Sequence, residues 1–287
     1  MDKKAEIKRI IIFLILVFVL QSVPFLFYKS IYGGDGTDNL YIVLGSFSMF
    51  TPALAHILTR IITKEGWKDS LLGTNFRKAW KWYFIGAASI LVFTFIGQIL
   101  LFAEFFPEYT AKEFFEGENR IAGLIVAFLN TGAYAVAGFL ICMGEEFGWR
   151  GYLFPKLEKV TNIPVAILIT GVVWGVWHYP NGIFLDDAST FAEMLLNQTL
   201  SCILICPFFV LLTKKSGSIY PASIAHSLNN SFAAFILTNS SIMNDTEKLE
   251  TVMNQSATFV SYINLILIAV ISTALLIYFK KKENISQ

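Results

Sequence analysis

The sequence predicts an all-α protein built as a polytopic bundle of transmembrane helices, and two observations carry this prediction. Of the 287 residues, 55% are hydrophobic and only 15% are charged, and the mean hydropathy is +0.59. These values lie well outside the range of soluble globular domains. The apolar residues are also gathered into runs long enough to cross about 30 Å of hydrocarbon.

About eight such runs are expected to be membrane spans. They cover residues 10–28, 40–62, 83–106, 121–148, 163–183, 191–213, 218–238 and 258–279. We expect the first run to be retained, because its apolar region is long and no small-x-small cleavage pattern follows it. The sequence contains no internal repeat or soluble segment, so residues 1–287 are expected to form a single integral membrane domain.

The basic residues predict how the spans are oriented. Cytoplasmic loops collect Lys and Arg, and most of the basic residues fall in the N-terminus and in segments 59–82, 156–159, 214–215 and 280–282. These segments alternate with loops that hold few basic residues. Both termini are therefore predicted to be cytoplasmic, in a multi-pass protein of the cell membrane.

Overall charge and cysteine placement exclude other classes of protein. The net charge is only +1, whereas binding to nucleic acid requires a concentrated basic face. The expected partners are instead the lipid bilayer and a peptide or protein substrate; no oligomeric state is predicted. Cys142, Cys202 and Cys206 all lie within apolar runs, where cysteine is expected to be a small core residue and not part of a disulfide.

Three polar motifs interrupt the apolar runs. Carboxylates inside a membrane are energetically expensive, so they are functional candidates. A spacing of four residues places two side chains on one face of a helix, whereas adjacent residues point about 100° apart. The motifs are Glu145-Glu146 with Arg150, Trp174 with His178, and His226 with Asn230.

The depth of these motifs indicates a single site. The turn between the fourth and fifth spans is expected near residues 161–164, so Glu145 and His178 face each other across an antiparallel hairpin. At a rise of 1.5 Å per residue, Glu145 and His226 both lie roughly 16 Å from the predicted cytoplasmic lysines. We therefore expect a cavity near the middle of the membrane that opens toward the cytoplasmic face.

The residue types suggest distinct roles for these side chains. A carboxylate shielded from water is a stronger base, so Glu145 is expected to activate a water molecule and later to protonate a leaving amine. His178 can hold and orient that water. His226 and Asn230 can donate hydrogen bonds to a developing oxyanion.

Two further polar side chains are expected to support the site, and one histidine is expected to lie outside it. Glu146 and Arg150 are predicted to form an ion pair that braces the helix face. His56 has no acid near it in the sequence and is expected to be a packing residue.

The order of the three motifs resembles the CAAX protease and bacteriocin-processing (CPBP, or Abi) family of intramembrane proteases, with its Rce1-like CAAX prenyl protease 2 members. The resemblance covers about 121–238, the expected catalytic core. Glu145-Glu146-Phe-Gly-Trp-Arg150-Gly-Tyr-Leu153 is similar to the first motif. Trp174 stands where the second motif usually has Phe and keeps an aromatic wall, while His226 and Asn230 match the third.

This resemblance implies hydrolysis of a peptide bond inside the membrane. Glu145 would activate water with the assistance of His178, and His226 and Asn230 would form the oxyanion site. Two histidines and a carboxylate can also form an open catalytic zinc site, with His178, His226 and Glu145 as ligands. Because the helical signature His-Glu-x-x-His is absent, we prefer chemistry without a cofactor and keep zinc as the alternative.

Two other functions remain compatible with the same residues. One is a catalytically silent bacteriocin self-immunity or scaffold protein that binds a partner through the cavity. The other is a proton-coupled transporter with buried Glu and His as a relay, which the lack of inverted repeats disfavours. For a protease, the substrate is either a prenylated protein ending in a CAAX box or a bacteriocin-like peptide.

Overall fold

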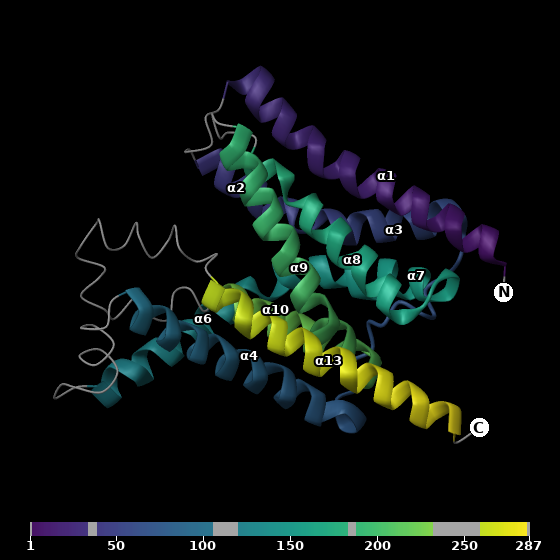
Figure 1. Cartoon of the computed structure of the whole chain (residues 1–287). Coiled ribbons are helices and arrows are strands. Elements are labelled where there is room, and N and C mark those ends of the chain that lie inside the picture. Colours follow the sequence, from purple (N-terminus) through teal and green to yellow (C-terminus); the bar gives the residue numbers. More distant parts are fainter. Residues whose placement is uncertain (1, 34–38, 106–119, 183–187, 232–258, 286–287) are drawn as a thin grey trace.

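The structure, a computed structural model, describes residues 2–33, 39–105, 120–182, 188–231 and 259–285, and all regular elements within these ranges are helices (Figure 1). This confirms the predicted all-α class. The elements are α1 (Lys3–Phe27), η1 (Tyr28–Tyr32), α2 (Asn39–Ser48), α3 (Thr51–Thr63), α4 (Phe76–Phe105), α6 (Arg120–Gly148), η3 (Trp149–Leu153), α7 (Phe154–Val160), α8 (Ile163–Trp177), η4 (Tyr179–Gly182), α9 (Ala188–Ser216), α10 (Tyr220–Ser231) and α13 (Phe259–Ile285).

Several of these helices are suited to a membrane. Within the described ranges, Lys3–Tyr32, Phe76–Gly97 and Ala188–Ser216 are each long and apolar enough to cross one, and α2 with α3 qualifies as a further, bent span. Ile163–Trp177 and Leu265–Phe279 are shorter apolar helices. Such helices are typical of an integral membrane protein. The number of spans stays a prediction, and residues 232–238 of the seventh lie outside the described residues.

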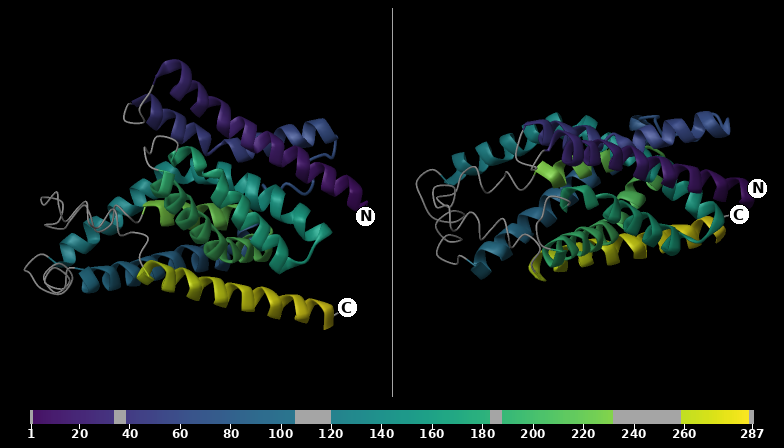
Figure 2. Two further views of the ribbon diagram at one scale, coloured as in Figure 1. Left: turned by 45° about the horizontal axis from the view of Figure 1, so that its top comes forward. Right: turned by 90° about the horizontal axis from the view of Figure 1, so that it is seen from above.

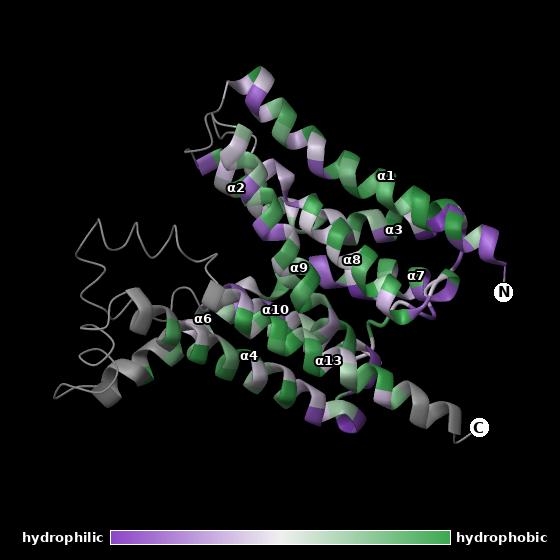
Figure 3. Cartoon of the chain, in the orientation of Figure 1, coloured by the Kyte–Doolittle hydropathy of each residue, from purple (hydrophilic) through white to green (hydrophobic). Residues whose placement is uncertain are grey.

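The ends of the bundle differ in polarity. The start of α1 and the end of α13 lie at the same end of the bundle (Figure 2). Polar residues gather at that end, near the start of α1 and around α7, whereas the middle parts of the helices are mostly apolar (Figure 3). This arrangement agrees with termini on one side of the membrane; which side is cytoplasmic remains a prediction from the basic residues.

Two predicted spans are not continuous α-helices. In the second, α2 and α3 are bent by 44° at their junction, and Pro52 lies in the first turn of α3, where its missing N–H is tolerated. In the fifth, α8 ends at Trp177 and His178 is its C-cap. Pro180 follows closely, and the residue before a proline avoids the helical conformation. The site histidine therefore lies at a helix end.

Helix α3 docks closely against the end of α6. A Cβ atom built on Gly148 would lie 2.3 Å from Cβ of Pro52 and 2.6 Å from its carbonyl carbon, so only glycine permits this approach. His56 Nδ1 lies 2.9 Å from the carbonyl oxygen of Phe147, and Arg60 Nε donates to His56 Nε2. Because arginine only donates, His56 Nδ1 carries the hydrogen given to Phe147. His56 is thus a packing residue with both ring nitrogens bonded.

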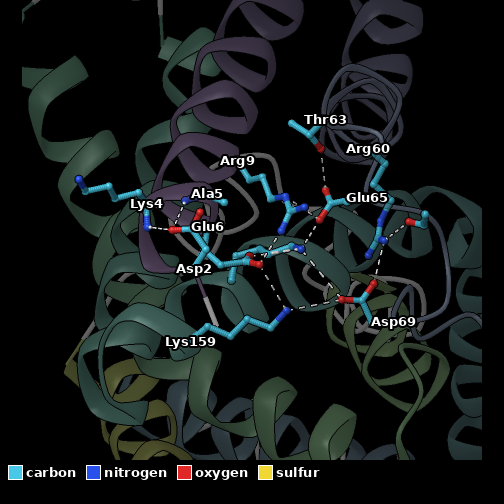
Figure 4. Close-up of polar contacts among 12 residues, drawn as sticks. Asp2, Lys4, Ala5, Glu6, Arg9, Arg60, Thr63, Glu65, Asp69 and Lys159 are labelled. Carbon is cyan, nitrogen blue, oxygen red and sulfur yellow. Dashed lines mark hydrogen bonds and ion pairs between the residues drawn. The ribbon is translucent and has the colours of Figure 1, made fainter.

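A cluster of ion pairs ties α1, α3 and the following loop to α7 (Figure 4). Lys156 is only 2% exposed, and its Nζ donates to Glu65 and lies 3.4 Å from Glu6. Burial raises the pKa of the Glu65 carboxyl, but hydrogen bonds from Lys156 and Tyr152 outweigh it and the pKa is lowered. The remaining members of the cluster are Arg9, Arg60, Asp69 and Lys159.

Replacing Gly148 tests the contact between α3 and α6. Gly148→Ala is expected to destabilise the protein by about 1–3 kcal/mol, because the added methyl group overlaps Pro52 and must push the helices apart. Gly132→Ala is the matched control: it lies in the same helix and its Cβ would meet nothing within 4 Å. The measurement is thermal unfolding in detergent, and equal melting temperatures for the two variants would contradict the close approach.

Candidate active site

The site is a cavity of about 620 Å³, and the four predicted catalytic residues all line it: Glu145, His178, His226 and Asn230. They come from α6, the end of α8, and α10. The rest of the lining includes neutral polar side chains that sequence reasoning did not single out, namely Gln21, Ser48, Gln198, Ser201 and Asn229. Amides and hydroxyls of this kind can pair with the N–H and C=O groups of a peptide.

Glu145 is held by a hydrogen bond that the sequence analysis missed. Its side chain is buried, and Oε2 accepts a hydrogen bond of 2.6 Å from Nε1 of Trp174. Trp174 is therefore more than an aromatic wall, because it fixes one oxygen of the carboxylate. The sequence did contain a signal for this bond, because a buried indole N–H needs a hydrogen-bond acceptor. The phenylalanine usual at this position has no N–H group to donate.

His178 is oriented by the helix that it ends. Its Nδ1 lies 2.9 Å from the carbonyl oxygen of Trp174, one helical turn earlier. A carbonyl oxygen only accepts, so Nδ1 carries the hydrogen and Nε2 of the neutral ring is an acceptor. This tautomer suits a group that receives a hydrogen bond from water in the cavity.

Glu146 connects two of the motifs. Its Oε1 accepts from Arg150 Nη1 at 2.9 Å, which is the geometry of the predicted ion pair. The same oxygen lies 2.9 Å from His226 Nδ1, a contact that the sequence analysis did not predict. Both Glu146 and Arg150 are fully buried. Glu146 therefore joins α6 to α10 in addition to bracing its own helix.

Aromatic rings surround the guanidinium of Arg150. Its Cζ lies 4.2 Å from the ring centre of Trp174 and 4.9 Å from that of Phe209, distances at which cation–π attraction operates. His226 packs against the same two rings, with its centre 5.4 Å from each. Phe209 was not predicted, because it lies within a uniformly apolar run that offers no distinguishing signal.

The bond from His226 to Glu146 limits what the imidazole can do. Since Nδ1 donates to the carboxylate, Nε2 is an acceptor when the ring is neutral and a donor only when it is the imidazolium. Asn230, one turn further along α10, lies with Nδ2 3.7 Å from Cys142 Sγ, a weak interaction. Asn230 thus brings an amide to the cavity beside His226.

The residues named for the zinc alternative lie around the same cavity. Among the residues with a described placement, no group of three His, Cys, Asp or Glu side chains is arranged to hold a metal ion. Glu145, His178 and His226 line one cavity, but they do not form a ligand shell as they stand. The reaction without a cofactor and the zinc alternative both stay predictions from the sequence.

The fold and the site together define a helical membrane protein with a polar cavity between its helices. Glu, His and Asn side chains line that cavity. Residues 127–232 match the family model described as Type II CAAX prenyl endopeptidase Rce1-like. This segment contains all three motifs and is similar to the Rce1-like endopeptidase domain.

A curated relative supports the same relationship. The chain is 30% identical over 116 residues to "CAAX prenyl protease 2" from Methanococcus maripaludis, an alignment that covers 37% of this chain and 40% of the relative. The chain therefore matches less than half of the relative's length.

The ion pair between Glu146 and Arg150 gives a prediction about stability. Arg150→Met is expected to cost about 3–5 kcal/mol, because it leaves a buried carboxylate without its partner. Combining it with Glu146→Gln should cost less than the sum of the two single changes, because the two residues interact directly. The measurement is a double-mutant cycle of unfolding in detergent.

A matched control is the more exposed pair of Lys214 and Glu158, whose side chains are 34% and 28% exposed. A cycle at this pair is expected to give a coupling of at most about 1 kcal/mol. Additive effects at Glu146 and Arg150 would contradict the assigned interaction.

Proposed function

We propose that the protein is an intramembrane endopeptidase that hydrolyses a peptide bond of a membrane-associated peptide or protein. The observation that carries this proposal is the single cavity lined by Glu145, His178, His226 and Asn230. Its support is that these residues belong to the segment that matches the Rce1-like endopeptidase family.

In the proposed reaction, the Glu145 carboxylate removes a proton from a water molecule, and the water oxygen attacks the carbonyl carbon of the peptide bond. His178 Nε2 accepts a hydrogen bond from the same water and orients it. The tetrahedral intermediate then collapses as the C–N bond breaks, and the proton held by Glu145 passes to the leaving amine. The products are a carboxylate and an amine, with one water consumed.

In this proposal the developing oxyanion lies near α10. Asn230 can donate from its amide, and His226 can donate from Nε2 when its ring is the imidazolium. Trp174 keeps Glu145 in position through the indole hydrogen bond. Glu146, Arg150 and Trp174 are thus positioning residues in this mechanism.

The proposed substrates are prenylated proteins of the CAAX type, because the curated relative is named a CAAX prenyl protease. Bacteriocin-like peptides are the second candidate from the family resemblance. That the cavity opens toward the cytoplasmic face stays a prediction from the basic residues.

Replacing Glu145 tests the proposed base. Glu145→Gln is expected to lower cleavage by at least about 10²-fold, since an amide cannot take the proton from water. The measurement is hydrolysis of a prenylated CAAX peptide by purified protein, together with the membrane peptidome of cells that express each form. Glu193→Gln, an exposed acid on α9, is the matched control and should cleave normally.

Unchanged cleavage by folded Glu145→Gln protein would overturn the mechanism. A Glu145→Gln variant that cleaves no peptide but still protects cells against a bacteriocin would point to another function. The silent immunity or scaffold function would then replace the proposed protease function.

Metal content gives a separate test of the reaction. We expect the purified, active protein to hold zinc far below one equivalent and to keep its activity after treatment with a chelator. Elemental analysis and activity are measured on the same samples. Stoichiometric zinc, with activity lost on its removal and restored on its return, would show instead that His178, His226 and Glu145 rearrange into a catalytic zinc site.

A further inference from the structure

The N-terminal helices supply part of the wall of the active-site cavity. Gln21 of α1, and Gly45 and Ser48 of α2, line it together with the proposed catalytic side chains. These three residues precede the segment 127–232 that matches the family model. The family match therefore assigns them no role.

A chain of hydrogen bonds fixes the carboxamide of Gln21. Trp177 Nε1 donates to Thr51 Oγ1 at 3.1 Å, and Thr51 Oγ1 lies 3.1 Å from Gln21 Oε1. An indole N–H can only donate, so the Thr51 hydroxyl accepts from Trp177 and has its own hydrogen left for Gln21. Gln21 therefore receives this bond with its carbonyl oxygen, which leaves the two N–H groups of Nε2.

The amide nitrogen of Gln21 is open to an occupant of the cavity. Within the described part of the chain, the bond from Thr51 is the one hydrogen bond of this side chain. Gln21 is only 2% exposed, yet it lines the cavity. A buried donor without a partner costs free energy, so Nε2 offers its N–H groups to an acceptor that enters the cavity.

Helix α1 is held in register with His178. Trp177 and Tyr179 are the neighbours of this histidine in the chain. Trp177 reaches Gln21 through Thr51, and the Tyr179 hydroxyl donates to Ser22 Oγ at 2.6 Å. The position of the Gln21 amide is therefore tied to both sides of His178.

Backbone carbonyl groups are acceptors that every peptide carries, whatever its side chains. A peptide that enters the cavity loses water from these groups, and each carbonyl then needs a donor. The proposed oxyanion donors come from α10, whereas Gln21 comes from α1 at the edge of the bundle (Figure 1). Gln21 is therefore suited to a carbonyl other than the one that reacts.

We propose that Gln21 Nε2 donates a hydrogen bond to a backbone carbonyl oxygen of the substrate, at a peptide bond that is not cleaved. Gln21 is thus a substrate-binding residue from the N-terminal helix, and Thr51 orients it. Because the donor meets the backbone, it holds peptides of different sequence in the same place relative to Glu145. This inference rests on the proposed endopeptidase function.

The test compares Gln21→Met with Asn197→Leu. Asn197 also accepts a bond from a hydroxyl, that of Tyr262, but it is not part of the cavity lining, so it is the matched control. For Gln21→Met, the KM for a prenylated CAAX peptide is expected to rise about tenfold. Its kcat should stay within about twofold, because the lost bond is made equally in the bound substrate and in the transition state.

Binding is measured separately from cleavage. On the Glu145→Gln background, the Kd of the same peptide is expected to rise about tenfold when Gln21→Met is added. Asn197→Leu should leave both KM and Kd unchanged.

A set of altered peptides identifies the acceptor. Each peptide has one uncleaved C=O group replaced by CH2, and its Kd is measured on the Glu145→Gln protein with and without Gln21→Met. One of these peptides is expected to bind about tenfold more weakly only where Gln21 is present, because the donor and the acceptor belong to the same hydrogen bond.

If Gln21→Met lowers the melting temperature, Gln21→Glu replaces it, because the carboxylate keeps an oxygen for Thr51 and loses the N–H donors. Unchanged KM and Kd, a fall in kcat alone, or the absence of a coupled carbonyl would overturn the inference. Coupled binding without cleavage by the otherwise intact protein would overturn only the proposed function. A protein that neither binds nor cleaves the peptide would overturn both.

Discussion

The arrangement of the site depends on one buried carboxylate, that of Glu146. Its Oε1 bonds Arg150 on its own helical segment and His226 on α10, and Arg150 in turn lies between the rings of Trp174 and Phe209. A charge in such a place is tolerated only while its partners stay in position. Glu146 of α6 therefore bonds η3 and α10 directly, and through Arg150 it is linked to α8 and α9, so movement of these segments would disturb the partners of a buried charge.

The helices at the N-terminus, which lie outside the segment that matches the family, complete this support. Helix α3 contacts α6 where Gly148 meets Pro52, and His56 bonds the carbonyl oxygen of Phe147, the residue directly after Glu146. Glu145 and Glu146 are thus fixed from α8 and α10 on one side and from α3 on the other. The ion-pair cluster around Lys156 then ties α3 and α1 to α7, so the chain is also anchored beyond the end of α6.

Local spacing was enough to predict some of these relations, and chain distance explains why others were missed. The pair of Glu146 and Arg150 follows from four-residue spacing, and the common depth of the motifs follows from helix length. The bond from His226 to Glu146 joins residues 80 positions apart, and no periodicity encodes it. The apolar runs did not predict where two helices begin or end, because these runs continue past the prolines. Pro52 lies at the start of α3 and Pro180 follows the end of α8.

The tryptophan at position 174 shows how one such long-range contact alters the chemistry that the sequence suggests. The resemblance leads one to expect phenylalanine there, a residue that packs but donates no hydrogen bond. With tryptophan, the indole N–H holds Oε2 of Glu145, and in the proposed reaction Oε1 is the oxygen left to take the proton from water. Fixing a reacting group in this way removes rotational freedom that would otherwise be lost in the transition state. The substitution therefore preserves the aromatic wall and also makes Trp174 a positioning residue for the proposed base, which a phenylalanine cannot be.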